Sequence, residues 1–273
     1  EPTMTVGEWM LGEARVSIAE SHLASGGGKI LLIHDVTFTH RMKAELERNQ
    51  RLAAMGEMAA SLAHQLRTPL AAALLYAANL GQPGMADEAR ARFSEKATGQ
   101  LRRLERLIQD VLLFARGESI GRDVIPAGDL LLEAAQTVEP LMREHGIAFA
   151  AVDHCEGAIL VGGRKALFGA LINLLENAMQ ATPAGGKICL TGNRRGDWVA
   201  VSVSDNGPGV DPDKKARIFE PFFTTKGQGT GLGLAIALGV ARAHGGAIEL
   251  FSAPGQGAEF VMTLPVSTTE EES

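Results

Sequence analysis

One histidine of this sequence is placed where its side chain could act as a nucleophile. His64 lies in a stretch with helical spacing, and counting from Ala59 puts it on the face turned toward water. Thr68 follows one turn later on the same face, and Pro69, which lacks an N–H group, is expected to bend the helix just past that turn. Neutral imidazole is nucleophilic near pH 7, so the segment predicts covalent chemistry at His64; a merely solvated histidine is the alternative.

Two asparagines, Asn173 and Asn177, form a second group that could do chemistry. Their spacing of four residues in the segment NLLENA puts both amides on one helix face, with apolar residues packed behind them. Asparagine in mid-helix costs helix propensity. Amide oxygens suit a partly hydrated Mg²⁺ that also takes phosphate oxygens, so the pair predicts such a site, with two ordinary surface side chains as the alternative.

Two glycine clusters follow. Asp205 begins the segment DNGPG at a predicted strand end, where a carboxylate could accept from an exocyclic amine such as that of adenine. Residues 227–234 (GQGTGLGL) open a helix whose N–H groups favour phosphate, but they match neither a P-loop nor a dinucleotide fingerprint. The roughly 20 residues between the clusters, which include Arg217 and Lys226, predict a lid over a nucleotide. Each cluster alone could be a simple turn.

Long helices are expected to carry His64. Residues 39–80 keep a helical period, which predicts one helix of about 40 residues and about 60 Å. A second helix follows the turn at 81–84. Each has one apolar seam, so together they form half of a four-helix bundle and predict a homodimer; a monomeric hairpin packed on the next domain is the alternative. The seam residues are Leu52, Met55, Ala59, Leu62 and Leu66, then Ala97, Leu101, Leu104, Ile108, Val111 and Ala115.

Strands are predicted on both sides of these helices. Residues 13–36 alternate polar and apolar around a turn at 25–28, which indicates an antiparallel hairpin too small to be a domain. Residues 124–266 alternate helix and strand, which predicts helices on one face of a mixed sheet. The predicted helices are 127–144, 163–181 and 231–244, and the predicted strands are 147–152, 158–161, 187–194, 197–204, 247–251 and 258–264.

Composition excludes several classes of protein. The 273 residues, 45% hydrophobic and 21% charged, fit one large or two modest globular domains. A net charge of −6 with scattered Lys and Arg argues against a nucleic-acid partner. Cys155 and Cys189 lack metal-ligand spacing and are expected to be buried, reduced thiols in a cytoplasmic protein. No apolar run reaches about 18 residues, so no membrane segment is predicted, and the start at Glu1 suggests part of a longer chain.

Five segments together resemble the motifs of sensor histidine kinases of two-component systems. In chain order they are AHQLRTPL (63–70), NLLENA (173–178), DNGPG (205–209), IFEPFFTTK (218–226) and GTGLGL (229–234). The resemblance implies an α+β chain: a HisKA-type helical hairpin that dimerises as a four-helix bundle, then a HATPase-type α/β sandwich of the kind shared with gyrase and MutL. Residues 35–37 are similar to the end of a PAS sensor domain. The stretch before His64 is similar to soluble flagellar or nitrogen-type sensors.

The resemblance also implies residue roles. His64 would take the γ-phosphoryl group of ATP and pass it to an aspartate of a response regulator receiver domain, with Mg²⁺ held by Asn177. Asn173 would assist on the phosphate side and Asp205 would contact adenine. The remaining ATP-binding residues would be Gly207, Gly209, Arg217, Lys226, Gly229, Thr230, Gly231, Leu232 and Gly233.

Two side chains beside His64 are expected to have roles of their own. The Thr68 hydroxyl is expected to orient a water for dephosphorylation of the regulator. Gln65 departs from the acidic residue common in the family; it is expected to accept a hydrogen bond from the imidazole Nδ1–H without acting as a base, so autophosphorylation would be slow but real.

The domain limits that follow are 1–38 for a PAS-like sheet remnant, 39–118 for the phosphotransfer domain, 122–267 for the ATP-binding domain and 268–273 for a polar tail. Two other functions compete with kinase activity. A gyrase- or MutL-like ATPase would need a Glu as general base where Asn173 stands. A kinase-poor scaffold or phosphatase-dominant sensor of the same fold would bind ATP with little labelling of His64.

Overall fold

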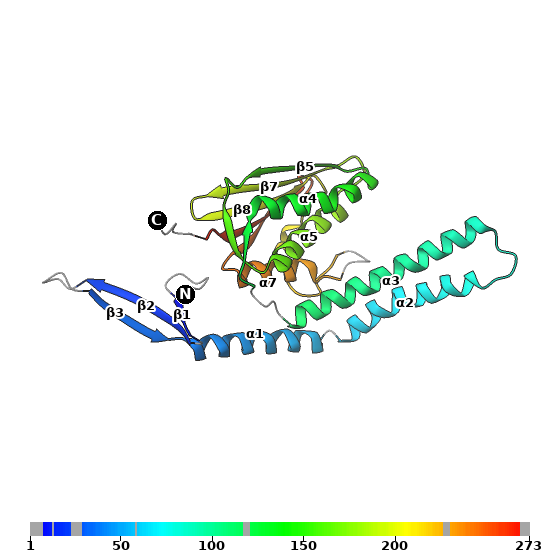
Figure 1. Ribbon diagram of the computed structural model, residues 1–273. Coiled ribbons are helices and arrows are strands. Elements are labelled where there is room, and N and C mark those ends of the chain that lie inside the picture. Colours follow the sequence, from blue (N-terminus) through cyan, green and yellow to red (C-terminus); the bar gives the residue numbers. More distant parts are fainter. Residues whose placement is uncertain are drawn as a thin grey trace.

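The computed structural model describes residues 8–12, 14–22, 29–57, 59–116, 121–225 and 230–267. Figure 1 shows three parts in chain order: a small sheet, a long helical region and an α/β domain that lies beside the helices. The lid residues Lys226 and Gly229, the turn at 25–28 and the tail at 268–273 lie outside the described residues.

The first part is an antiparallel sheet in the order β1-β2-β3, formed by Glu8–Leu11, Ala14–His22 and Lys29–Asp35. The predicted hairpin is confirmed as β2 and β3, in which Val16 lies opposite Asp35. Strand β1 was not predicted, because four residues are too few to show an alternating pattern and their pairing with β2 is a tertiary contact.

Three helices follow: α1 (Thr37–Glu57), α2 (Ala59–Leu80) and α3 (Asp87–Arg116). Helices α1 and α2 cover the range 39–80 for which one helix was predicted, so the helical character is confirmed; whether the two helices are continuous is not tested, because Met58 between them lies outside the described residues. Helix α2 does not end at the buried Pro69 but continues for eleven residues to Leu80. Helices α2 and α3 pack as an antiparallel hairpin (Figure 1).

The α/β domain contains a five-stranded sheet in the order β5-β7-β8-β10-β9, in which only β5 and β7 run parallel, and a separate β4-β6 pair. The predicted helices and strands are all present within two residues of their expected ends. The strands are β4 Asp123–Pro126, β5 Ala148–His154, β6 Ile159–Gly162, β7 Lys187–Arg195, β8 Trp198–Asp205, β9 Ala247–Ser252 and β10 Ala258–Pro265; the helices are α4 Ala127–Glu144, α5 Arg164–Ala181, α6 Pro212–Lys215 and α7 Gly233–Ala243.

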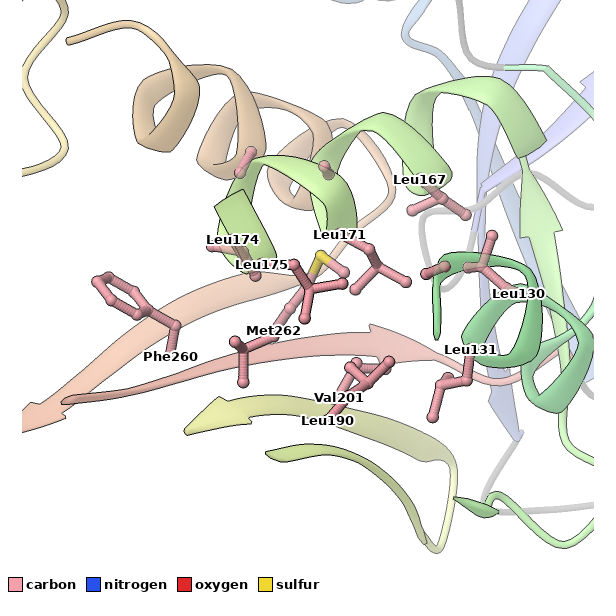
Figure 2. Packing of buried hydrophobic residues seen from close by; sticks show 14 of the residues in the cluster. Leu130, Leu131, Leu167, Leu171, Leu174, Leu175, Leu190, Val201, Phe260 and Met262 are labelled. Carbon is pink, nitrogen blue, oxygen red and sulfur yellow. The ribbon is translucent and has the colours of Figure 1, made fainter. Parts of the chain in front are cut away.

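Helices α4, α5 and α7 cover one face of this sheet, as predicted, and the core lies between the two layers (Figure 2). Alternate residues of β10, Phe260, Met262 and Leu264, are at most 1% exposed because a strand turns every second side chain to the same face. They meet leucines of α5 such as Leu171 and Leu174 (Figure 2). Strand β4 and helix α6, of four residues each, were not predicted, because such short segments hardly display a period.

His244 has a structural role. It caps the end of α7, is 2% exposed, and joins two elements: its Nε2 accepts from the Gly163 N–H at 3.0 Å, and its Nδ1 lies 2.8 Å from the Val240 carbonyl oxygen. Burial lowers the pKa of its imidazole below the ordinary value. These contacts hold α7 against the loop that precedes α5.

The two cysteines are free thiols. Cys155 is buried as predicted, and burial raises the pKa of its thiol to about 12. The expectation of burial is wrong for Cys189, which is only half-buried. Its side chain is on the sheet face that the helices leave uncovered, and its Sγ lies 3.4 Å from the Thr191 hydroxyl oxygen.

Candidate nucleotide and phosphoacceptor site

His64 lies near the start of α2 with its side chain exposed to solvent. Thr68, also exposed, donates its hydroxyl to the His64 carbonyl oxygen at 3.1 Å, which fixes the Thr68 side chain one turn beyond the imidazole. A hydroxyl that donates to a carbonyl keeps lone pairs with which it can accept from water. The predicted shared face of His64 and Thr68 is therefore present.

Gln65 does not make the contact that the sequence suggested. Its Oε1 is buried and has no hydrogen-bond partner among the described residues, so it does not accept from the His64 imidazole. The reason is geometric: neighbouring residues on a helix point about 100° apart, which turns Gln65 away from the exposed face of His64.

This orphaned oxygen leads to a prediction for Gln65→Leu. A buried, unsatisfied acceptor costs about 1–3 kcal/mol, so leucine of similar size should leave the free energy of unfolding unchanged or raise it by about 1 kcal/mol. Because the imidazole loses no hydrogen bond, the labelling rate of His64 should stay within about twofold. Thermal unfolding and rapid-quench labelling measure these values, and a much slower variant would show that Gln65 touches the imidazole during transfer.

The two asparagines lie on α5, behind which Leu174, Leu175 and Ala178 are fully buried as predicted. The Asn173 side chain lies against the start of α7: a Cβ atom added to Gly233 would come within 3.5 Å of its Oδ1. Asn177 is half-buried one turn further along. The packing of α5 on α7 thus brings Asn173, 60 residues earlier in the chain, to the second glycine cluster.

Asp205 is 7% exposed at the end of β8, and its Oδ1 accepts from the backbone N–H groups of Gly207 at 2.9 Å and Ala258 at 3.3 Å. Glycine is required twice in the loop that follows. A Cβ at Gly207 would lie 2.8 Å from the Ala181 carbonyl oxygen, and Gly209 has a φ of +72°. The carboxylate is thus held rigidly where α5 ends.

A hollow of about 300 Å³ also borders Asp205. It is lined by the end of β8 and the turn between β9 and β10, and by neither asparagine nor any residue of the second glycine cluster. The hollow therefore does not reach Asn173, Asn177 or the start of α7.

The second glycine cluster leads into α7. The Thr230 hydroxyl accepts from the Leu232 N–H at 3.2 Å, and Gly231, with a φ of +67°, accepts from the Phe222 N–H at 2.8 Å. A Cβ on Gly231 would lie 2.4 Å from the Phe222 carbonyl carbon. Gly233 is the first residue of α7, so the free N–H groups of this helix end face the site.

Arg217 is not brought to the second glycine cluster. Its Nε donates to the Glu220 carboxylate at 3.1 Å, and its guanidinium lies over the Phe223 ring, 4.5 Å from the centroid. Lys226 and Gly229, the other lid residues expected to face ATP, lie outside the described residues.

Three residues that the sequence analysis missed lie on α3: Arg106, Asp110 and Phe114. Each contacts the α/β domain, and the sequence gives no sign of this beyond their spacing of four. Burial, with the neighbouring Glu176 carboxylate as the second cause, raises the pKa of Asp110 to about 6. The contacts are Arg106 to the Glu176 carboxylate at 3.5 Å, Asp110 to the Thr230 hydroxyl at 3.4 Å, and Phe114 edge-on to Phe222 with ring centroids 5.9 Å apart.

The donor set fits magnesium when phosphate is present. No cluster of three His, Cys, Asp or Glu side chains suited to a metal occurs in the described part of the chain. Mg²⁺ typically takes one or two protein oxygens and completes its shell with water and substrate phosphates. The amide oxygens of Asn173, beside the start of α7, and of Asn177, one turn further along α5, match that preference.

Comparisons with known families agree with this architecture. The His Kinase A (phospho-acceptor) domain family matches residues 54–120, and the family described as Histidine kinase-, DNA gyrase B-, and HSP90-like ATPase matches residues 162–268. The first match contains His64 and the second contains both asparagines and both glycine clusters. The chain therefore belongs to the sensor histidine kinases of two-component systems.

Individual relatives carry the same domains. The sensor protein kinase FleS of Pseudomonas aeruginosa is 42% identical over 254 residues, which are 92% of this chain and 62% of FleS. The signal transduction histidine-protein kinase AtoS of Escherichia coli is 31% identical over 93% of this chain and 42% of AtoS. The chain thus spans less than two thirds of the length of either relative.

Among solved structures, histidine kinase ThkA in complex with the response regulator protein TrrA superimposes with a TM-score of 0.69 over 97% of this chain and 79% of that one, at 27% identity. Full-length ShkA in complex with AMPPNP has a TM-score of 0.59 and 35% identity over 78% of this chain and 46% of that one. Among the described residues, no helix has the length and apolar character needed to cross a membrane.

Proposed function

We propose that this chain is an ATP-dependent protein histidine kinase that phosphorylates itself on His64 and passes the phosphoryl group to an aspartate of a response regulator. One observation carries the proposal: an exposed histidine on the hairpin is combined, in one chain, with a domain in which Asn173 lies against the start of α7. The names of FleS and AtoS, and the pairing of ThkA with a response regulator, support it.

The chemistry of the transfer follows from the geometry of the imidazole. The Nε2 lone pair of His64 forms the N–P bond to the γ-phosphorus, while the bond to the β–γ bridging oxygen breaks and its electron pair leaves on ADP. The proton on Nδ1 is then released to solvent. The His64 side chain is exposed, so the imidazole is open to solvent in this conformation.

The residues of the α/β domain orient the nucleotide in this proposal. Asp205 accepts from the adenine amino group, and the N–H groups at the start of α7 bind phosphate oxygens, with Asn173 beside them. Mg²⁺, held by Asn177, would neutralise charge on the phosphates. Gly207, Gly209, Gly231 and Gly233 let the backbone approach, while Arg217 and Lys226 would have to turn in from the lid.

A homodimer is part of the proposal, because the hairpin leaves large apolar side chains uncovered. A four-helix bundle formed with a second copy would bury them. Light scattering on the purified chain should give twice the monomer mass. The exposed apolar residues are Leu70, Leu74, Leu75, Leu101, Ile108 and Leu112, each 44–63% exposed.

Phosphatase activity toward the regulator is a second candidate, favoured by the fixed Thr68 hydroxyl one turn beyond His64. Thr68→Ala should lose dephosphorylation of the phosphorylated regulator about tenfold or more, because a hydroxyl that positions a water is gone, while autophosphorylation changes little. Thr68→Ser keeps the hydroxyl and is the matched control. Equal loss of both activities in the alanine variant would instead indicate damage to α2 beside Pro69.

Incubation with γ-labelled ATP tests the main proposal. The expected product is a phosphoprotein whose label is lost in acid and retained in alkali, as for a phosphoramidate, with the phosphate found on His64 by mass spectrometry. Nucleotide binding without label on His64 would favour the kinase-poor scaffold. Steady phosphate release without a phosphoprotein would favour the gyrase-like ATPase.

A further inference from the structure

One face of α3 contacts the α/β domain at both ends of the lid. Asp110 and Phe114 are four residues apart and therefore share a helix face. Phe114 touches Phe222, which precedes the segment 226–229, and Asp110 accepts from Thr230, which follows it. The hairpin thus contacts residues on both sides of the segment 226–229: Phe222 before it and Thr230 after it.

Phe222 has an unusual backbone. Its φ of +65° is disfavoured for a residue with a Cβ atom, and such a conformation persists only where the surroundings hold it. Here its N–H donates to the Gly231 carbonyl oxygen, and its ring, 8% exposed, packs edge-on against Phe114. The hairpin therefore supplies part of what holds this strained residue.

Thr230 relays the second contact. Its hydroxyl donates to Asp110 Oδ2 at 3.4 Å and accepts from the Leu232 N–H at 3.2 Å. Leu232 directly precedes Gly233, the first residue of α7, where the phosphate-binding N–H groups lie. A side chain of α3 is thus two hydrogen bonds away from the loop that must bind phosphate.

We infer that Asp110 and Phe114 are positioning residues of the ATP site, which hold the base of the lid on the hairpin and so preorganise the second glycine cluster for phosphate. The inference rests on the proposed function only in taking ATP as the ligand. A loop already held in place loses less conformational entropy when it binds nucleotide. The contacts of Asp110 and Phe114, called the anchor below, therefore increase the affinity for nucleotide. By thermodynamic reciprocity, nucleotide must also strengthen the contact between the α/β domain and α3.

Calorimetric titration of the whole chain with a non-hydrolysable ATP analogue and Mg²⁺ tests the first consequence. Asp110→Ala removes the acceptor and Phe114→Ala removes the ring, and each should weaken binding about two- to tenfold, the range of one lost hydrogen bond or aromatic contact. Asp110→Asn should bind at least as tightly as the wild type, because its amide oxygen still accepts and a negative charge near the phosphates is gone. Glu105→Gln, an exposed acid on the same helix, is the matched control and should change nothing.

Hydrogen exchange measured by mass spectrometry tests the reciprocal consequence without any phosphoryl transfer. In the wild type, the analogue should slow exchange of the amides in 106–116 as well as those at the start of α7. In Asp110→Ala, protection by saturating analogue should remain in α7 and be lost in α3. A purely structural role for Asp110 would lower protection throughout the α/β domain even without nucleotide.

Two results would overturn the inference: alanine variants that bind the analogue as tightly as the wild type or more tightly, or an asparagine variant as weak as Asp110→Ala. If binding and exchange behave as expected while His64 remains unlabelled, the kinase proposal fails and the anchor stands. If His64 is labelled at the wild-type rate and KM for ATP in both alanine variants, the anchor fails and the kinase proposal stands.

Discussion

His64→Ala abolishes labelling by γ-labelled ATP, with a loss of at least about 10³-fold, because no other group replaces the nucleophile that forms the covalent intermediate. The side chain is exposed and makes no contact that alanine would disrupt, so the free energy of unfolding should change by less than about 0.5 kcal/mol. Circular dichroism and the calorimetric affinity for an ATP analogue should therefore match the wild type. The variant separates nucleotide binding from transfer.

His145→Ala is the matched control, since His145 is also exposed but lies at the end of α4. It should label at the wild-type rate. Wild-type labelling of His64→Ala would move the phosphoacceptor to another residue, and mass spectrometry of that product would identify it.

Asn177→Ala should lower labelling of His64 about 10²- to 10³-fold, the cost of removing one group that stabilises charge in the transition state. Alanine favours helix, and Asn177 is only half-buried, so α5 should persist. Asn177→Asp should fail as well, because a second negative charge beside the triphosphate opposes its binding. Initial rates at several Mg²⁺ concentrations measure the effect.

Gln180→Ala, an exposed position on the same helix, provides the control and should leave labelling unchanged. Chelation of Mg²⁺ should reduce wild-type labelling to the level of Asn177→Ala. Full activity of either Asn177 variant would remove this residue from the metal site, and the neighbouring Asn173 would become the next residue to substitute.

The longer helices and strands of the α/β domain were predictable because each shows its own pattern of apolar residues within a short stretch of sequence. Helix α4 occupies 127–144 as expected, since its apolar residues repeat with the helical period over five turns. Strand β10 alternates buried and half-buried residues along its length, a pattern that an antiparallel strand with one covered face imposes on its sequence. Three elements of four residues, β1, β4 and α6, were not predicted, because so short a segment hardly displays a period, although β6, of the same length, was predicted.

Side-chain contacts between distant segments were not predictable. Gln65 was expected to bond to its neighbour His64, yet the helix directs the two side chains apart and buries the Gln65 oxygen without a partner. Arg217 was expected at the phosphates, and it pairs with Glu220 instead. In both cases the residue type was compatible with the expected role. The helical period of about 100° per residue accounts for the direction of Gln65, whereas the partner of Arg217 depends on how its own segment folds.

The sequence by itself determined three features: His64 with the Thr68 hydroxyl one turn later, the asparagine pair, and the two glycine clusters. Each of them depends on residue types at fixed short separations. Only the tertiary structure decided how these groups meet: that α5 packs on α7, and that Asp110 and Phe114 of the hairpin hold Thr230 and Phe222. The physical reason is that backbone periodicity is set within one or two turns. Contacts across more than 100 residues are set by which apolar faces bury each other.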